Sequence, residues 1–187
     1  SPVATYLVRR YLIATDRPDY KTATRLLKTI TQRQPDNQYA HRLLADCKDK
    51  KTLDTGSIIP SFATYDINGK TVSTATLSSK PTVVVFAWSS WNYSSTSMLR
   101  QLSRKARESN GNIAVVGICL NPDQRSCRNT LKLYEAQDVT TICDGKMVDG
   151  DVYNKLGMYN LPDNIVIKNG KIVARNLNTT QLMEKIK

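Results

Sequence analysis

The sequence predicts a three-layer α/β/α fold with a mixed central sheet, preceded by an N-terminal helical arm. Over residues 52–187, β-prone runs alternate with amphipathic stretches, an order typical of a mostly parallel sheet with helices on both faces. The last two β-prone runs are joined by Asn169-Gly170, which favours a two-residue hairpin at an antiparallel edge. Residues 1–51 carry apolar side chains at helical spacing.

The N-terminal arm is predicted to form three helices separated by two polar breaks. The first break is Asp16-Arg17-Pro18-Asp19, and we expect Asp19 to cap the helix that follows. The second break is Gln34-Pro35-Asp36-Asn37, with Asp36 as the expected cap. The arm resembles one helical-repeat unit, but such units need neighbours to bury their apolar faces. We therefore interpret residues 1–51 as an arm or the remnant of an upstream region.

The elements of residues 52–187 follow from their apolar patterns and turn residues. Asn68-Gly69 lies between two β-prone runs and predicts a hairpin with a type I′ turn. The continuous apolar run Thr82–Trp88 predicts a strand covered on both faces. The other predicted elements, in chain order, are a helix through Met98, Leu99, Leu102 and Ala106, a strand at Asn112–Leu120, a helix at Asp123–Ala136, a strand at Val139–Cys143, a helical turn at Val152–Leu156, strands at Asn164–Lys168 and Lys171–Arg175, and a helix at Thr180–Lys187.

Composition limits the classes of protein that this chain can represent. The 187 residues suffice for one domain and an appendage, and no apolar run approaches the roughly 20 residues of a membrane helix. The net charge is +11, and residues 1–51 carry more than half of the excess. The charges alternate with other side chains as on a solvated helix face, so we expect no nucleic-acid partner. The chain begins at Ser1 without Met or signal peptide, and we expect a longer precursor.

The cysteines and the single histidine do not form a recognisable metal motif. Cys47, Cys119, Cys127 and Cys143 include no C-x-x-C pair, and the only histidine is His41. A structural zinc site usually needs four close nitrogen or sulfur ligands, so we expect no metal and no cofactor. Cys47 and His41 are interpreted as ordinary helix residues.

Three local signatures in residues 55–187 resemble the thioredoxin-like superfamily, in particular its envelope AhpC/TSA (redoxin) and TlpA-like branch. The first is Gly56-Ser57-Ile58-Ile59-Pro60-Ser61-Phe62, followed by Asp66-Ile67-Asn68-Gly69-Lys70 and Leu77. The second is Trp88-Ser89-Ser90-Trp91-Asn92-Tyr93-Ser94-Ser95, which resembles Trp-Ala-Ser-Trp-Cys-x-x-Cys. The third is Leu161-Pro162 before a strand, where the family has a cis-proline, with Asn169-Gly170-Lys171-Ile172-Val173 after it.

The resemblance implies that the residues of disulfide chemistry have been replaced. Asn92 stands at the position of the nucleophilic cysteine and Ser95 at that of the resolving cysteine, and Met98 stands where the envelope reductases often have an acid. Disulfide exchange needs a thiolate and a second thiol, and neither an amide nor a serine hydroxyl replaces them. A peroxidatic cysteine would lie in the same loop, so the peroxidase interpretation fails as well.

The serines of the motif and the three cysteines of residues 52–187 each have a structural interpretation and a chemical one. Hydrolysis by Ser94 or Ser95 would need a nearby base, so we interpret both serines as caps of the helix that follows. Cys119, Cys127 and Cys143 are interpreted as small core residues. The alternatives are a Cys119–Cys143 disulfide, because these residues end strands that are neighbours in the family, and a relocated redox pair.

The leading hypothesis is a redox-inactive thioredoxin-like domain that acts as a binding or structural module of the cell envelope. The resemblance implies a peptide groove bordered by Trp88, Trp91, Tyr93 and Leu161-Pro162, with an unknown protein or peptide as its partner. Trp88 at a strand end suits the core, whereas Trp91 and Tyr93 suit either core or binding surface. The alternatives are a thiol-disulfide oxidoreductase of cell redox homeostasis that uses the other cysteines, and a basic module that binds an anionic partner. Export to the periplasm is implied by the family branch alone.

Overall fold

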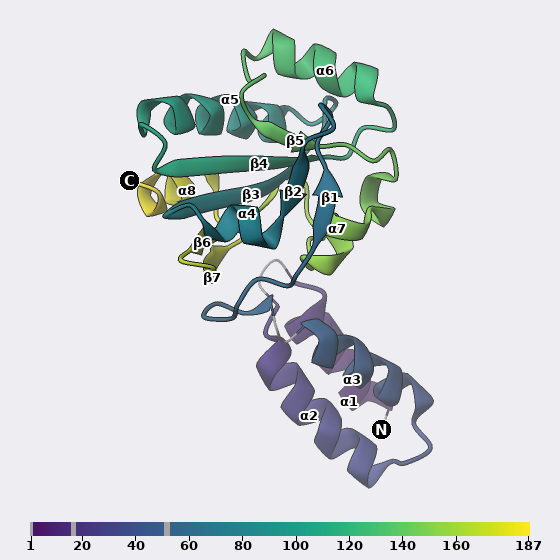
Figure 1. Cartoon of the computed structure of the whole chain (residues 1–187). Coiled ribbons are helices and arrows are strands. Elements are labelled where there is room, and N and C mark those ends of the chain that lie inside the picture. Colours follow the sequence, from purple (N-terminus) through teal and green to yellow (C-terminus); the bar gives the residue numbers. More distant parts are fainter. Residues whose placement is uncertain (1, 16–17, 51–52) are drawn as a thin grey trace. The chain divides into compact units, whose positions relative to one another are not determined.

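The computed structural model describes residues 2–15, 18–50 and 53–187 (Figure 1). The chain divides into two compact units, residues 1–57 and residues 58–187. Each unit has its own hydrophobic core. Among the described residues, no helix has the length and apolar character needed to cross a membrane.

The N-terminal unit consists of helices packed around a small core. Asp19 caps the second long helix, as predicted, because its carboxylate accepts a hydrogen bond of 2.8 Å from the Thr22 N–H. The predicted cap Asp36 is wrong by one residue: the Asn37 side chain accepts from the Ala40 N–H. The helices are α1 (Pro2–Val8), a π-helix (Arg9–Ile13), α2 (Tyr20–Arg33) and α3 (Gln38–Lys50). Their core residues are Val8, Tyr20, Ala23, Leu27, Ala40, Leu43, Leu44 and Cys47.

The second unit contains the predicted mixed sheet, with five strands in the order β5-β4-β3-β6-β7. Strand β3 is central and apolar after Thr82, and it pairs parallel with β4 and antiparallel with β6. The parallel strands β3, β4 and β5 therefore end at the same edge of the sheet. The bounds are β3 (Thr82–Trp88), β4 (Ile113–Cys119), β5 (Thr140–Ile142), β6 (Asp163–Lys168) and β7 (Lys171–Arg175).

Helices cover both faces of this sheet, which confirms the predicted α/β class (Figure 1). Side chains of α4 (Thr74–Ser78) and α7 (Asp151–Lys155) belong to the core on one face, together with Leu156. Side chains of α5 (Tyr93–Glu108), α6 (Gln124–Leu133) and α8 (Thr179–Lys185) belong to the core on the other face. A short 3₁₀ helix (Met147–Asp149) precedes α7.

The two Asn-Gly dipeptides form different turns. Asn169 and Gly170 have φ angles of 51° and 74°, as a type I′ turn between β6 and β7 requires. The turn between β1 (Ala63–Tyr65) and β2 (Thr71–Ser73) is wider, and of the pair Asn68-Gly69 only Gly69 has a positive φ. The Asp66 carboxylate organises it by accepting from the N–H groups of Asn68 and Lys70. The predicted type I′ turn at Asn68-Gly69 is therefore wrong.

Candidate functional site

The loop between β3 and α5 is held at the edge where the parallel strands end. Trp88 is the last residue of β3, and its carbonyl accepts from the Leu120 N–H after β4. The Ser90 N–H donates to the side-chain oxygen of Asn121, at 2.9 Å. Asn121 in turn donates to the Ser126 hydroxyl at the start of α6. The loop is thus fixed to the neighbouring strand and helix.

Asn92 performs two structural tasks with one amide group. Its side-chain oxygen accepts from the Ser95 N–H at 2.8 Å, so Asn92 is the N-cap of α5. Its side-chain nitrogen donates to the Leu161 carbonyl at 3.3 Å, in the residue before Pro162. The Leu161–Pro162 peptide bond is cis. Asn92 thus connects the start of α5 to the segment that contains Pro162.

Ser95 is buried and fully engaged with the backbone. Its hydroxyl lies at donor distance from two carbonyl oxygens, 3.1 Å from that of Ser89 and 2.8 Å from that of Asn92. It also accepts a hydrogen bond of 3.1 Å from the Ser89 N–H. Its exposure is 0%. The prediction that Ser94 and Ser95 cap α5 is wrong, because the cap is Asn92 and the Ser95 hydroxyl closes the preceding loop instead.

The aromatic side chains of the motif separate into one core residue and two surface residues. Trp88 is completely buried, as suits a strand end. It therefore has no exposed surface with which to border the predicted groove, and its place in that groove was predicted wrongly. Trp91 and Tyr93 are exposed by 56% and 84%. Leu161 and Pro162 are half-buried. We call Trp91, Tyr93, Ser94, Leu161 and Pro162 the motif surface.

At the position in α5 where the envelope reductases often have an acid, this chain has Met98. Met98 is 1% exposed and belongs to the core under α5. A buried carboxyl does lie next to Pro162 in the chain: it belongs to Asp163, which we did not predict from the sequence as a site residue. One of its oxygens accepts from the N–H groups of Tyr159 and Asn160. Burial raises the pKa of Asp163, although these two N–H groups oppose the shift.

The second unit contains no histidine that could act as the base for serine chemistry. The only histidine of the chain is His41, which belongs to the N-terminal unit. Its Nε2 lies 3.0 Å from the carbonyl oxygen of Pro35, within the same unit. Ser94 is exposed at the start of α5. The arrangement of a serine nucleophile and its base is therefore not assembled in this unit.

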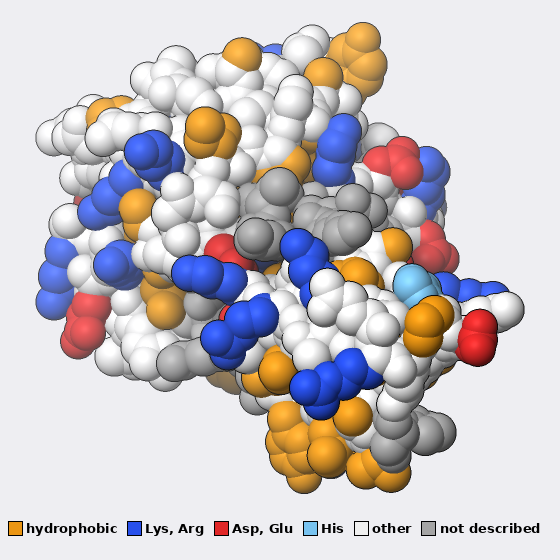
Figure 2. Space-filling model, turned by 90° about the horizontal axis from the view of Figure 1, so that it is seen from below, with side chains coloured by type: hydrophobic (Ala, Val, Ile, Leu, Met, Phe, Trp, Pro, Cys, Tyr) orange, Lys and Arg blue, Asp and Glu red, His pale blue; other side chains and the backbone are white. Residues whose placement is uncertain are grey.

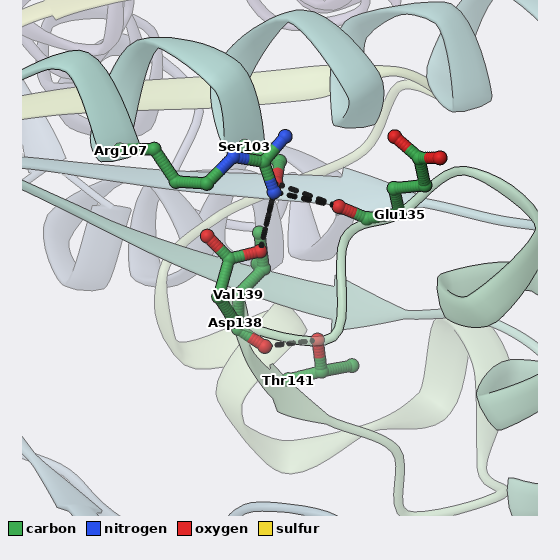
Figure 3. Close-up of polar contacts among 6 residues, drawn as sticks. All are labelled: Ser103, Arg107, Glu135, Asp138, Val139 and Thr141. Atoms are coloured by element: carbon green, nitrogen blue, oxygen red, sulfur yellow. Dashed lines mark hydrogen bonds and ion pairs between the residues drawn. The ribbon is translucent and has the colours of Figure 1, made fainter.

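The arginines of α5 make local ion pairs. Arg104 pairs with Glu108 one turn later, and Arg107 pairs with Asp138 at 3.2 Å. Figure 3 shows that Arg107 also reaches the Glu135 carbonyl, while Ser103 donates to the same Asp138 carboxylate. Arg100 is exposed. The contacts of Arg107 and Ser103 attach α5 to the segment before β5.

Three cysteines meet at the edge where the parallel strands end. Cys119 is the last residue of β4, Cys127 lies in the first turns of α6, and Cys143 follows β5. Their sulfur atoms all lie within 4.8 Å of one another, and all three side chains are buried. They are free thiols, so the structure contains no Cys119–Cys143 disulfide.

The three thiols influence each other's ionisation. Hydrogen bonding with Cys127 and Cys143, together with burial, raises the pKa of the Cys119 thiol. Donation from Cys119 and Cys127 lowers the pKa of Cys143, and the Gly145 N–H contributes in the same direction. The Cys143 sulfur also lies 3.7 Å from the carbonyl oxygen of Asn121. The sequence indicated that Cys119 and Cys143 end neighbouring strands. The signal for Cys127 is its place in the first turns of the helix that follows Cys119, because that helix must begin over the same edge.

Comparisons with solved structures give the same fold. The C-terminal domain of a protein assigned as a thiol-disulfide oxidoreductase in Bacteroides thetaiotaomicron is 27% identical, with a TM-score of 0.62, covering 72% of this chain and 95% of that one. A thioredoxin-like protein from Bacteroides caccae covers 97% of this chain and 68% of its own, at 14% identity and a TM-score of 0.71. A secreted disulfide oxidoreductase from Mycobacterium tuberculosis has 17% identity and a TM-score of 0.57, covering 67% of this chain and 93% of its own.

The family comparison matches the part of the chain that contains the motif surface and the cysteine cluster. No curated protein matches the chain. The AhpC/TSA family matches residues 55–175, which include all strands of the sheet. Together with the mixed sheet and its thioredoxin-like structural neighbours, this match shows that the chain belongs to the AhpC/TSA family of the thioredoxin-like superfamily.

Proposed function

We propose that this protein is a redox-inactive thioredoxin-like domain that acts as a binding or structural module of the cell envelope. One observation carries the proposal: the residues at the two redox positions are committed to structure. Asn92 caps α5 and holds the Leu161 carbonyl, and the Ser95 hydroxyl is buried against backbone groups. Neither residue has a thiol, and disulfide exchange needs one thiol to attack and a second to resolve the mixed disulfide.

The motif surface supports the binding part of the proposal. Trp91 and Tyr93 expose large aromatic faces, although most large apolar side chains of this unit are buried. Exposed tryptophan and tyrosine side chains are efficient anchors for protein partners. Asn92, which lies between Trp91 and Tyr93 in the chain, donates to the carbonyl of Leu161, the residue before Pro162. The backbone before β6 is suited to strand-like recognition of an extended peptide.

Reduction of insulin by dithiothreitol tests the loss of disulfide chemistry. The full chain should not accelerate insulin precipitation beyond the reductant alone. Robust turnover that persists in the variant C119A/C127A/C143A would contradict the proposal, because the chain would then be active without its clustered cysteines and the assignment of the two redox positions would be wrong. Turnover that disappears in this variant would support an oxidoreductase that uses the clustered cysteines instead.

Binding at the motif surface is tested with a library of extended peptides presented to the full chain. We expect peptides that bind the wild-type chain and lose affinity for W91A/Y93A. The matched control is Y65A, since Tyr65 is 68% exposed on β1 of the same unit. Peptides that bind both variants equally would place recognition elsewhere and contradict this part of the proposal.

The two alternatives have weaker support. The clustered cysteines are 0–4% exposed, so a protein disulfide has poor access to their sulfurs. A basic module should have a concentrated positive face. On the face seen in Figure 2, Lys and Arg side chains are spread among uncharged ones, and steep salt dependence of binding would be needed to favour this alternative.

The proposal also places the protein in the cell envelope. This placement rests on the resemblance to the envelope branch and on the secreted structural neighbour. The sequence of the full-length precursor tests it. A signal sequence or lipid-attachment motif before Ser1 is expected, and a precursor that starts with an ordinary cytosolic domain would contradict it.

A further inference from the structure

We propose that Cys119, Cys127 and Cys143 form a three-thiolate site for Cu(I). The site shares no residue with the motif surface, so it goes beyond the proposed function and does not depend on it. Its basis is a cluster of three buried sulfurs brought together from a strand end, a helix start and a loop. Such convergence at the carboxyl ends of parallel strands is where α/β proteins commonly bind ligands.

The spacing of the sulfurs is close to that of a metal site. A metal–sulfur bond of about 2.3 Å places three sulfurs in a trigonal arrangement about 4 Å apart. The three sulfurs already lie within 4.8 Å of one another. Binding therefore requires the cluster to contract by less than about 1 Å, which rotation of cysteine side chains can provide.

The type and number of ligands favour Cu(I) over other thiophilic ions. Soft thiolate ligands select Cu(I), Zn(II) and iron–sulfur clusters. Structural zinc sites and iron–sulfur clusters take four protein ligands. In the part of the chain that the structure describes, no histidine and no carboxylate completes the cluster to four. Three sulfurs without a fourth ligand suit a monovalent d¹⁰ ion with trigonal coordination.

Several groups around the cluster favour negatively charged sulfur and oppose the effect of burial, which acts to raise the pKa of all three thiols. Cys127 lies at the fourth position of α6, near the N-terminal end of the helix, where the dipole is favourable to anions. The backbone N–H group of Asn121 acts to lower the pKa of Cys119, and that of Gly145 acts to lower the pKa of Cys143. Hydrogen bonds of this kind to ligating sulfurs are typical of metal–thiolate sites. The Arg128 charge lies near Cys127 as well.

Burial explains why the cluster is better suited to an ion than to exchange with a protein disulfide. The side chains of Cys119, Cys127 and Cys143 are 2%, 0% and 4% exposed. A disulfide substrate must bring its own sulfur in line with the attacking thiolate, whereas a single ion needs only a narrow path. Cys143 follows the edge strand β5 and is the most exposed of the three, so the ion would enter beside it.

Titration of the reduced full chain with Cu(I), in competition with bicinchoninate under anaerobic conditions, tests the site. We expect one Cu(I) per chain and a thiolate-to-metal charge-transfer band in the ultraviolet. C119S, C127S and C143S should each weaken binding more than about 100-fold, since loss of a ligand costs more than loss of a supporting hydrogen bond. C47S is the matched control, because Cys47 is also buried but lies in the other unit, and it should bind as the wild-type chain does.

X-ray absorption of the Cu(I)-loaded wild-type chain gives a readout that does not depend on variants. We expect a shell of three sulfurs at about 2.3 Å. A shell with two sulfurs, or with nitrogen or oxygen ligands, would overturn the proposal. So would a failure to compete with the chelator, equal binding by C127S, or displacement of bound Cu(I) by an equal amount of Zn(II).

Discussion

The Nε1 atom of Trp88 faces Gly117 on the neighbouring strand so closely that a Cβ at position 117 would lie 2.6 Å from it. Trp88 is fully buried on the sheet face covered by α5, α6 and α8. Position 117 therefore requires a glycine for steric reasons, since the indole is a rigid ring packed on all sides and cannot shift to make space for a Cβ.

Gly117→Ala is therefore expected to destabilise the second unit by about 1–3 kcal/mol, the usual cost of overpacking a core. Urea unfolding followed by tryptophan fluorescence measures this cost. In the background Trp88→Phe the substitution should cost less, because the smaller ring lacks the atom that meets the new Cβ. An equal cost in both backgrounds would show that the strain does not involve Trp88.

The N-cap role of Asn92 leads to a second prediction. Asn92→Ala removes the acceptor of the Ser95 N–H and the donor to the Leu161 carbonyl. We expect a loss of about 1–2 kcal/mol in the free energy of unfolding, because loss of an N-cap alone costs about 1 kcal/mol. The matched control is Ser94→Ala, two residues later on the exposed side of α5, which should change stability by less than about 0.5 kcal/mol. Similar losses in both variants would contradict the structural role of Asn92.

Cysteines placed at positions 92 and 95 should restore disulfide chemistry. The double variant N92C/S95C places thiols at the two redox positions, at the start of α5, where the helix N-terminus lowers the pKa of a thiol. We expect it to form an intramolecular disulfide and to reduce insulin in the presence of dithiothreitol. The single variant N92C has no resolving thiol and should remain inactive in turnover. An inactive N92C/S95C that folds normally would mean that the motif surface has lost more than its cysteines.

Much of the fold could be predicted from the sequence because strongly apolar runs and turn dipeptides act locally. Thr82–Trp88 is an example: seven consecutive residues, almost all buried, leave few alternatives to a central strand. Element ends were less predictable. The helix expected to reach Ala136 ends at Leu133, and Glu135 has a φ of 54°, which a right-handed helix does not allow. Glutamate rarely adopts a positive φ, so the sequence did not indicate this end.

The site was only partly predictable because its key contacts join distant segments. Local sequence identified position 92, but the partner of its amide is Leu161, 69 residues later. The place of Cys127 in the first turns of the helix after Cys119 indicated that it lies near the end of that strand. Spacing along the chain did not show that all three sulfurs meet, because they come from three elements that converge only in space. The buried Asp163 had no signal at all, because a polar residue beside a proline normally lies in a solvated turn.

The last prediction concerns Asp163 and the pH dependence of stability. Its side chain is 0% exposed, and one carboxyl oxygen has no partner among the described residues. Burial raises its pKa in the folded chain above the value of about 3.9 in the unfolded chain. A raised pKa in the folded state means that protonation favours folding. The stabilising contribution is thus complete below the unfolded pKa and is lost as the pH rises through the folded pKa.

Asp163→Asn removes this titration while retaining an oxygen that can accept from the N–H groups of Tyr159 and Asn160. The free energy of unfolding of Asp163→Asn, relative to that of the wild-type chain, should therefore increase between pH 3.5 and pH 7. Urea unfolding at several pH values measures this difference, which cancels the titration of all other groups. Asp149→Asn is the control, because it makes the same substitution at an exposed position. A constant difference for Asp163→Asn would mean that the buried carboxyl ionises as easily in the folded chain as in the unfolded one.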